Sequence, residues 1–130
     1  MNYGADRYCK LFVSGAADDE ALSAAVNAAL RESAERTAAG ADAVPVLDIT
    51  VHAQVRHLPL DDGQDDFTRW RHYLDIDAAQ EDVRFDVYLD ALARLVAALR
   101  ARGWRTVAAC DFEAQLETAV QAILAGKGEP

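Results

Sequence analysis

The sequence contains no long apolar run, and no segment approaches the roughly 20 apolar residues that a helix needs to cross a bilayer. No apolar stretch follows a basic start near the N-terminus, so we expect neither a secretion signal nor a membrane partner. Cysteine is scarce, and the two that are present, Cys9 and Cys110, fit no metal-binding spacing. Without a signal they are most simply reduced thiols of the core, and we predict a cytoplasmic protein.

Basic residues are also few. Thirteen Lys and Arg stand against 22 Asp and Glu, which gives a formal net charge of −9. Phosphate backbones are bound by clusters of Lys and Arg, and none is visible in this sequence, so a nucleic-acid partner is disfavoured. Residues 61–90 alone hold ten carboxylates against three arginines. This acidity is explained either by solubility or by a surface that meets a basic protein.

Sequence signatures of catalysis and cofactor binding are missing as well. The chain has no glycine-rich phosphate loop and no Gly-x-Ser-x-Gly, His-Glu-x-x-His or Cys-x-x-Cys motif. The aspartates in the turn at 59–66 lack the order of a calcium loop and its bidentate Glu. We therefore predict no cofactor and no metal, and we assign no residue a catalytic role.

Apolar residues, by contrast, make up 52 % of the 130 residues, although aromatic residues make up only 8 %. A chain of this length forms one domain and is long enough to bury a core. We predict a single domain over 1–130. Its core should consist of small side chains around a few large ones, which are Phe12, Trp70, Phe85 and Trp104.

Apolar residues recur at helical spacing in three segments. The first follows Asp18, a suitable cap, and should run to about Arg36. The second begins at Phe85 and stops at Gly103. The third, at about 113–125, predicts an additional C-terminal helix. The apolar stripes are Leu22, Val26, Ala29 and Leu30, then Phe85, Leu89, Leu92, Val96 and Leu99, then Leu116, Val120, Ile123 and Leu124.

Four other segments are typical of strands. Residues 8–13 and 104–112 are short and largely apolar. Residues 46–58 and 67–77 alternate apolar and polar side chains, which indicates strands with one buried and one exposed face. The turn at 59–66 joins these two into a hairpin. In the second of them, the residues predicted to face the core are Thr68, Trp70, His72, Leu74 and Ile76.

The element order is strand, helix, strand, strand, helix, strand, helix. Right-handed crossovers place the first two helices on one face of a single sheet. This predicts an α+β, ferredoxin-like βαββαβ sandwich with antiparallel strand order 4-1-3-2, a core at about 7–113 and an extra C-terminal helix. Because the first and fourth strands are neighbours in this order, Cys9 and Cys110 are expected to lie close together as free thiols.

The polar side of the sheet is the candidate functional surface. His52 falls on this side, where Tyr73 or Asp75 can orient it as a general base if the register is favourable. Phe12 joins Tyr73 there as an exposed aromatic, whereas His72 falls on the other side as a packed, hydrogen-bonded histidine. The predicted partner-binding residues are Asp61, Asp62, Asp65, Asp66, Arg69, Arg71, Tyr73 and Asp75. The predicted ligand-binding residues are His52, Tyr73 and Asp75.

Three segments together resemble a group of small bacterial proteins. They are Tyr-Cys-Lys-Leu-Phe-Val at 8–13, Arg-His-Tyr-Leu-Asp-Ile-Asp at 71–77 and Val-Ala-Ala-Cys-Asp-Phe-Glu at 107–113. The resemblance covers roughly residues 7–113. It implies a compact α/β protein of the kind that accompanies polymorphic bacterial toxins as an immunity protein, and it transfers no catalytic residue to this chain.

Three functions remain in competition. The leading hypothesis is an acidic protein-binding module, an immunity protein that neutralises a basic toxin domain, since opposite charges speed association. The second is an enzyme or small-molecule sensor that uses the open sheet face. The third is a structural homodimer that joins two sheet faces.

Overall fold

The computed structural model describes residues 7–37, 46–53 and 70–126. In chain order, its elements are β1 (Cys9–Ser14), α1 (Asp19–Thr37), β2 (Leu47–Ala53), β3 (His72–Ala78), α2 (Phe85–Ala101), β4 (Arg105–Ala109) and α3 (Glu113–Gly126). Each predicted helix and strand is present. The ends of the predicted hairpin strands at 54–58 and 67–69, and the turn between them, lie outside the described residues.

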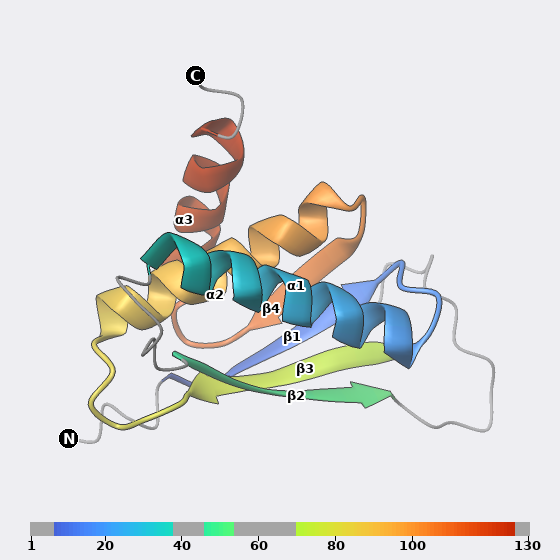
Figure 1. The fold of residues 1–130 in the computed structure, drawn as a ribbon, viewed down its shortest axis with the longest axis horizontal. Helices are drawn as coiled ribbons and strands as arrows, with labels where there is room; N and C mark the ends of the chain where they lie inside the picture. The colour runs from blue at the N-terminus through green and yellow to red at the C-terminus, as the bar shows by residue number, and fades with distance from the viewer. Residues whose placement is uncertain (1–6, 38–45, 54–69, 127–130) are drawn as a thin grey trace.

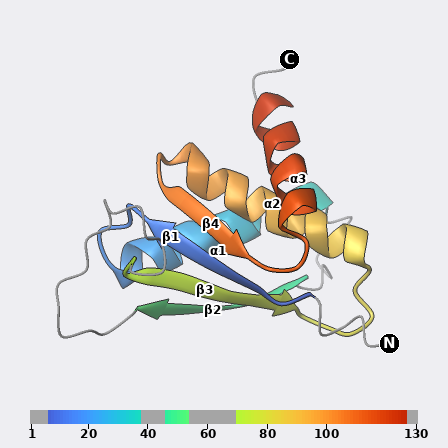
Figure 2. The ribbon, with the colours of Figure 1, turned by 180° about the vertical axis from the view of Figure 1, so that it is seen from behind.

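The strands form one antiparallel sheet in the order β2-β3-β1-β4, which is the predicted order 4-1-3-2 in reverse. α1 and α2 lie side by side on one face of this sheet (Figure 1). Seen from behind, the sheet lies in front of these helices (Figure 2). The ferredoxin-like arrangement is confirmed, and α3 is added against α2, beside the β4 edge.

Local signals set two of the helix ends. Asp18 Oδ1 accepts a hydrogen bond from the Ala21 N–H at 2.8 Å, so Asp18 caps α1 as predicted. After α2, the Gly103 N–H bonds to Arg100 O at 2.9 Å. Gly103 has a φ of 89°, a left-handed conformation that side chains with a Cβ rarely adopt, and the predicted stop is therefore confirmed.

The core lies between the sheet and the helices. Alternate residues of β1 and β3 point into it, so that Leu11, Leu74 and Ile76 are fully buried. α2 is buried over a wider arc than its predicted stripe, because α1 packs against one side of it and α3 against another. Tyr88 and Leu95 are buried there as well, and sequence periodicity alone had not indicated either of them.

Three of the four large side chains predicted for the core lie outside the main core cluster: Phe12, Trp70 and Phe85. Phe85 is the first residue of α2 and is 38 % exposed, although its ring packs edge-on against Phe112. Trp70 is buried but lies outside the main core cluster, with the Arg105 guanidinium 4.7 Å from its ring centre. The predicted burial of Trp70 is confirmed, but its predicted place in the main core is not, because β3 begins only at His72 and side-chain alternation does not extend into the preceding bend.

His72 is fully buried on the core side of β3, as predicted. Its Nε2 lies 2.8 Å from Oδ1 of Asp19, an exposed carboxylate in the first turn of α1. Nδ1 of His72 has no hydrogen-bond partner among the described residues. The Asp19 contact therefore ties the start of β3 to the start of α1 and satisfies one of the two ring nitrogens.

Candidate functional site

The face of the sheet turned away from the helices carries the candidate site. The strand register places His52 opposite Tyr73, and Thr50 opposite Asp75. On the other side of β3, Phe12 lies opposite Tyr73 and Lys10 opposite Asp75. Side chains directly opposite each other on one face lie within contact distance. Three strands thus contribute neighbouring polar and aromatic groups to one surface.

A hydrogen-bonded network centred on Asp75 organises this surface. Nε2 of His52 lies 2.8 Å from Asp75 Oδ2, and the Tyr8 hydroxyl donates a hydrogen bond to Asp75 Oδ1. Both carboxylate oxygens are therefore occupied by groups of the chain itself. Desolvation and the hydrogen bond to Asp75 raise the pKa of Tyr8 to about 12, so the phenol stays protonated as a donor at neutral pH.

Tyr73 lies between two other members of the surface. Its ring stacks on the His52 imidazole, with 4.8 Å between ring centroids and 14° between the planes. The Lys10 Nζ lies 4.4 Å from the Tyr73 ring centroid, a cation–π distance. His52 and Asp75 are each about one-third exposed, so the network is ordered by its own contacts and still accessible to a partner.

The end of the face next to this network is acidic. Asp48 in β2 and Asp77 in β3 lie directly opposite each other, and both are exposed. Like charges directly opposite each other on a sheet are destabilising. Together with Asp75, they make three carboxylates on the neighbouring strands β2 and β3.

The structure brings together the three predicted ligand-binding residues, His52, Tyr73 and Asp75. Arg71, predicted to bind a partner, is exposed in the bend before β3. The remaining predicted partner-binding residues lie outside the described residues; they are Asp61, Asp62, Asp65, Asp66 and Arg69.

Phe12 is buried and is not the exposed aromatic that its place in the strand predicted. The Lys10 Nζ lies 5.3 Å from its ring centre and the Tyr73 ring 6.0 Å away, so its neighbours on the face help to cover it. The hydrogen bond from Tyr8 to Asp75 was not predicted. Alternation shows which side a residue faces, whereas this bond depends on the register between β1 and β3.

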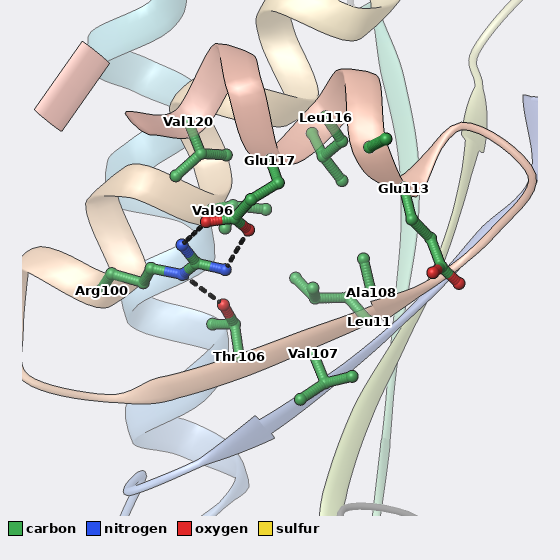
Figure 3. A pocket seen from close by; sticks show the side chains of 11 residues that line it. Leu11, Val96, Arg100, Thr106, Val107, Ala108, Glu113, Leu116, Glu117 and Val120 are labelled. Carbon is green, nitrogen blue, oxygen red and sulfur yellow. Dashed lines mark hydrogen bonds and ion pairs between the residues drawn. The ribbon is translucent and has the colours of Figure 1, made fainter. Parts of the chain in front are cut away.

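A concave region lies between α2, β4 and α3 and has a volume of about 440 Å³ (Figure 3). Its walls include the buried side chains Leu11, Val96, Leu116 and Val120. It is not lined by His52, Tyr73 or Asp75.

An ion pair braces this crevice. Nη1 and Nη2 of Arg100 donate to the two carboxylate oxygens of Glu117 at 2.8 Å each, and Nε donates to Thr106 Oγ1 at 2.8 Å. These hydrogen bonds from Arg100, with one from Gln121, lower the pKa of Glu117 to about 2. Since Arg100 is already engaged by α3 and β4, the crevice is better explained as the seam that holds α3 than as a ligand site.

Two general features concern the described ranges 7–37, 46–53 and 70–126. No cluster of three or more His, Cys, Asp or Glu side chains there is arranged to hold a metal ion. None of the helices in those ranges has the length and apolar character needed to span a membrane.

The chain matches no protein-family model, no curated protein and no solved structure.

Proposed function

We propose that this protein is an acidic protein-binding module that docks a basic partner on its open sheet face. The carrying observation is the ordered surface of His52, Tyr73 and Asp75, with the carboxylates of Asp48 and Asp77 beside it. Prearranged side chains lose little conformational freedom on binding, and a partner that brings Lys or Arg would meet complementary charge.

The like-charged pair of Asp48 and Asp77 supports a cationic partner specifically. Such a pair costs stability in the free protein, and a basic side chain placed between the two would relieve the repulsion. The formal net charge of −9 favours approach of the same class of partner over long range. It disfavours a second copy of this chain, which would bring its own acidic face to the contact.

The resemblance to immunity proteins gives the partner a concrete form. In this proposal it is a basic toxin domain encoded beside this protein, and docking neutralises it. The test is co-expression with the product of the neighbouring gene, followed by measurement of growth and of the purified complex. Restored growth together with a stable complex supports the proposal. A neighbour without toxic activity, or a toxin that is not bound, contradicts it.

Charge reversal at matched positions locates the docking face. Asp77→Lys removes the like-charged pair and should weaken toxin binding at least tenfold, with the loss mainly in the association rate and reduced by salt. Glu32→Lys makes the same charge change at an exposed position of α1, on the other side of the sheet, and should leave binding nearly unchanged. Asp77→Lys replaces a repulsion by an attraction with Asp48 but loses the hydrogen bond from the Ala78 N–H to Asp77 Oδ1, so a circular dichroism spectrum like that of the wild type is the check that the variant is folded. Equal effects of the two variants would contradict docking on the open face.

The pairing of His52 with Asp75 favours a second candidate function, binding or acid–base conversion of a small molecule on this face. A carboxylate that orients an imidazole is the arrangement used by general bases. A thermal-shift screen with a metabolite library tests it, because a ligand stabilises the folded state by mass action. Stabilisation lost in His52→Ala supports this candidate. Absence of any stabilising compound leaves protein binding as the function of the face.

A further inference from the structure

The two cysteines of the chain meet at one end of the pairing between β1 and the edge strand β4. β1 and β4 pair with Lys10 opposite Ala109, and the same antiparallel register places Cys9 opposite Cys110, the residue that follows β4. Both side chains face the core side, as Leu11 and Ala108 do. Residues directly opposite each other in an antiparallel pair have Cα atoms about 4.5–5.5 Å apart, which is within the range that a disulfide spans.

The two thiols are in direct contact and differ in accessibility. Cys9 and Cys110 form a side-chain hydrogen bond, and both are free thiols. Cys9 is fully buried, whereas Cys110 is partly exposed in the turn that leads into α3. The Phe112 N–H and the Cys9 thiol both donate toward the Cys110 sulfur, an arrangement that stabilises negative charge on Cys110 rather than on Cys9.

We propose that Cys9 and Cys110 form a redox modification site, at which hydrogen peroxide converts the two thiols into an intramolecular disulfide that fastens the start of α3 to the sheet. Cys110, the more accessible thiol, attacks as the thiolate. Its sulfur takes one peroxide oxygen to give a sulfenic acid, and the other peroxide oxygen leaves as water. The Cys9 sulfur then attacks the Cys110 sulfur, the S–O bond breaks and a second water leaves. The two thiols lose two protons and two electrons, and one peroxide is reduced to two waters.

The charged neighbours make this reaction slow at neutral pH. Burial raises the pKa of both thiols, and the nearby carboxylate of Glu113 acts on both in the same direction. Asp111 further raises the pKa of Cys110. Only a thiolate attacks peroxide, so below the pKa the rate should rise about tenfold per pH unit. The site therefore stays reduced in ordinary cytoplasmic conditions and responds to sustained peroxide.

The disulfide would act on the element that extends the ferredoxin-like core. Cys110 lies three residues before α3 begins, and its N–H donates to the Glu113 side chain at 3.2 Å. A covalent link from this turn to β1 would hold the start of α3 in place even when the brace between Arg100 and Glu117 opens. It would also close a loop of about 100 residues, which restricts the unfolded chain strongly.

The experiment treats the folded full-length protein with hydrogen peroxide, quenches it with an alkylating reagent and digests it with trypsin without reduction. Mass spectrometry should find peptide 8–10 joined to peptide 106–127, with the mass of the two peptides less two hydrogens. The link should vanish on reduction with dithiothreitol. Hydrogen exchange of α3 should slow by about tenfold or more in the oxidised protein, and by more than exchange of α1, which shares only the effect of the link on global unfolding.

The single variants Cys110→Ser and Cys9→Ala are the matched controls. Each should abolish the linked peptide and the slowed exchange, and Cys9→Ala should leave Cys110 as a sulfenic acid that a dimedone probe captures. The proposal is overturned if both thiols stay free in the wild-type protein after peroxide treatment, or if the disulfide joins two molecules. Sulfinic acid at Cys110 without a link, or unchanged exchange of α3, would overturn it equally.

Discussion

The two faces of this sheet are made by the same strands and are built for different purposes. On the covered face, Leu11 and Leu74 lie opposite each other in β1 and β3, and both are fully buried beneath α1 and α2. On the open face, Tyr73 and Asp75 make polar and aromatic contacts and stay partly exposed. Adjacent residues of β3 therefore point either into the core or to the open face, and if the proposed docking is right, a substitution should affect either stability or binding with little effect on the other.

Leu74→Ala tests the covered face and should have the largest effect on folding. Removing a fully buried Leu leaves a cavity and should lower the free energy of unfolding by about 3 kcal/mol. Urea denaturation followed by circular dichroism measures it. A loss below about 1 kcal/mol would mean that the core closes around the cavity or is less tightly packed than its burial indicates.

Asp19→Ala tests the polar contact within the covered side. It removes the partner of His72 Nε2 and leaves a buried ring with neither nitrogen paired among the described residues, at a cost of about 1–3 kcal/mol. Glu20→Ala is the control, because it removes an acid from the same first turn of α1 and should cost about 0.5 kcal/mol or less. Similar losses in both variants would assign the effect to the helix dipole.

Glu117→Gln tests the brace at the margin of the covered side. The folded pKa of Glu117, about 2, lies below its ordinary value of 4.5, so the ion pair stabilises the fold above about pH 4.5. This contribution is lost as the pH falls from 4.5 toward 2. Because Glu117 is half exposed, we expect the variant to lose no more than about 1 kcal/mol at pH 7. Denaturation at pH 7 and pH 3 should show the difference from wild type shrinking at the lower pH.

Tyr73→Ala tests the open face and should have the smallest effect on folding. It loses a stack with His52 and a contact with Lys10, together worth about 1 kcal/mol or less, although Tyr73 is the neighbour of Leu74 in the chain. In the proposed complex, its effect on binding should be far larger than its effect on stability, since aromatic groups dominate many interfaces. A loss of stability as large as that of Leu74→Ala would show that the two faces are not independent.

Which residues face the core and which face the open side could largely be predicted from the sequence, because the alternation of apolar and polar residues along a strand indicates which side is buried. Alternation in β3 placed His72 and Leu74 on one side and Tyr73 and Asp75 on the other, as observed. It failed at Trp70, where the chain bends before the strand begins. A period carries no information on where a strand starts, since that is decided by pairing with strands distant in sequence.

The chemistry of the open face was only partly predictable. Asp75 was a candidate neighbour for His52 because the two strands form a hairpin, and the structure places them 2.8 Å apart. The second contact of Asp75, from Tyr8, crosses from β1 to β3 and depends on a pairing that no local pattern specifies. The pairing of Asp19 with His72 escaped prediction for the same reason, since it joins a helix terminus to a strand 53 residues away.

The strand order also governs when the chain can fold during its synthesis. β1 is made early, yet its partners on either side are β3 and β4, which leave the ribosome some 60 to 100 residues later. Until Ala109 has emerged, β1 lacks its neighbour β4, and one edge of β1 has no strand to pair with. The nascent chain must therefore keep an incomplete sheet from associating with other chains, and completion of the fold waits until nearly all of the sequence described has been translated.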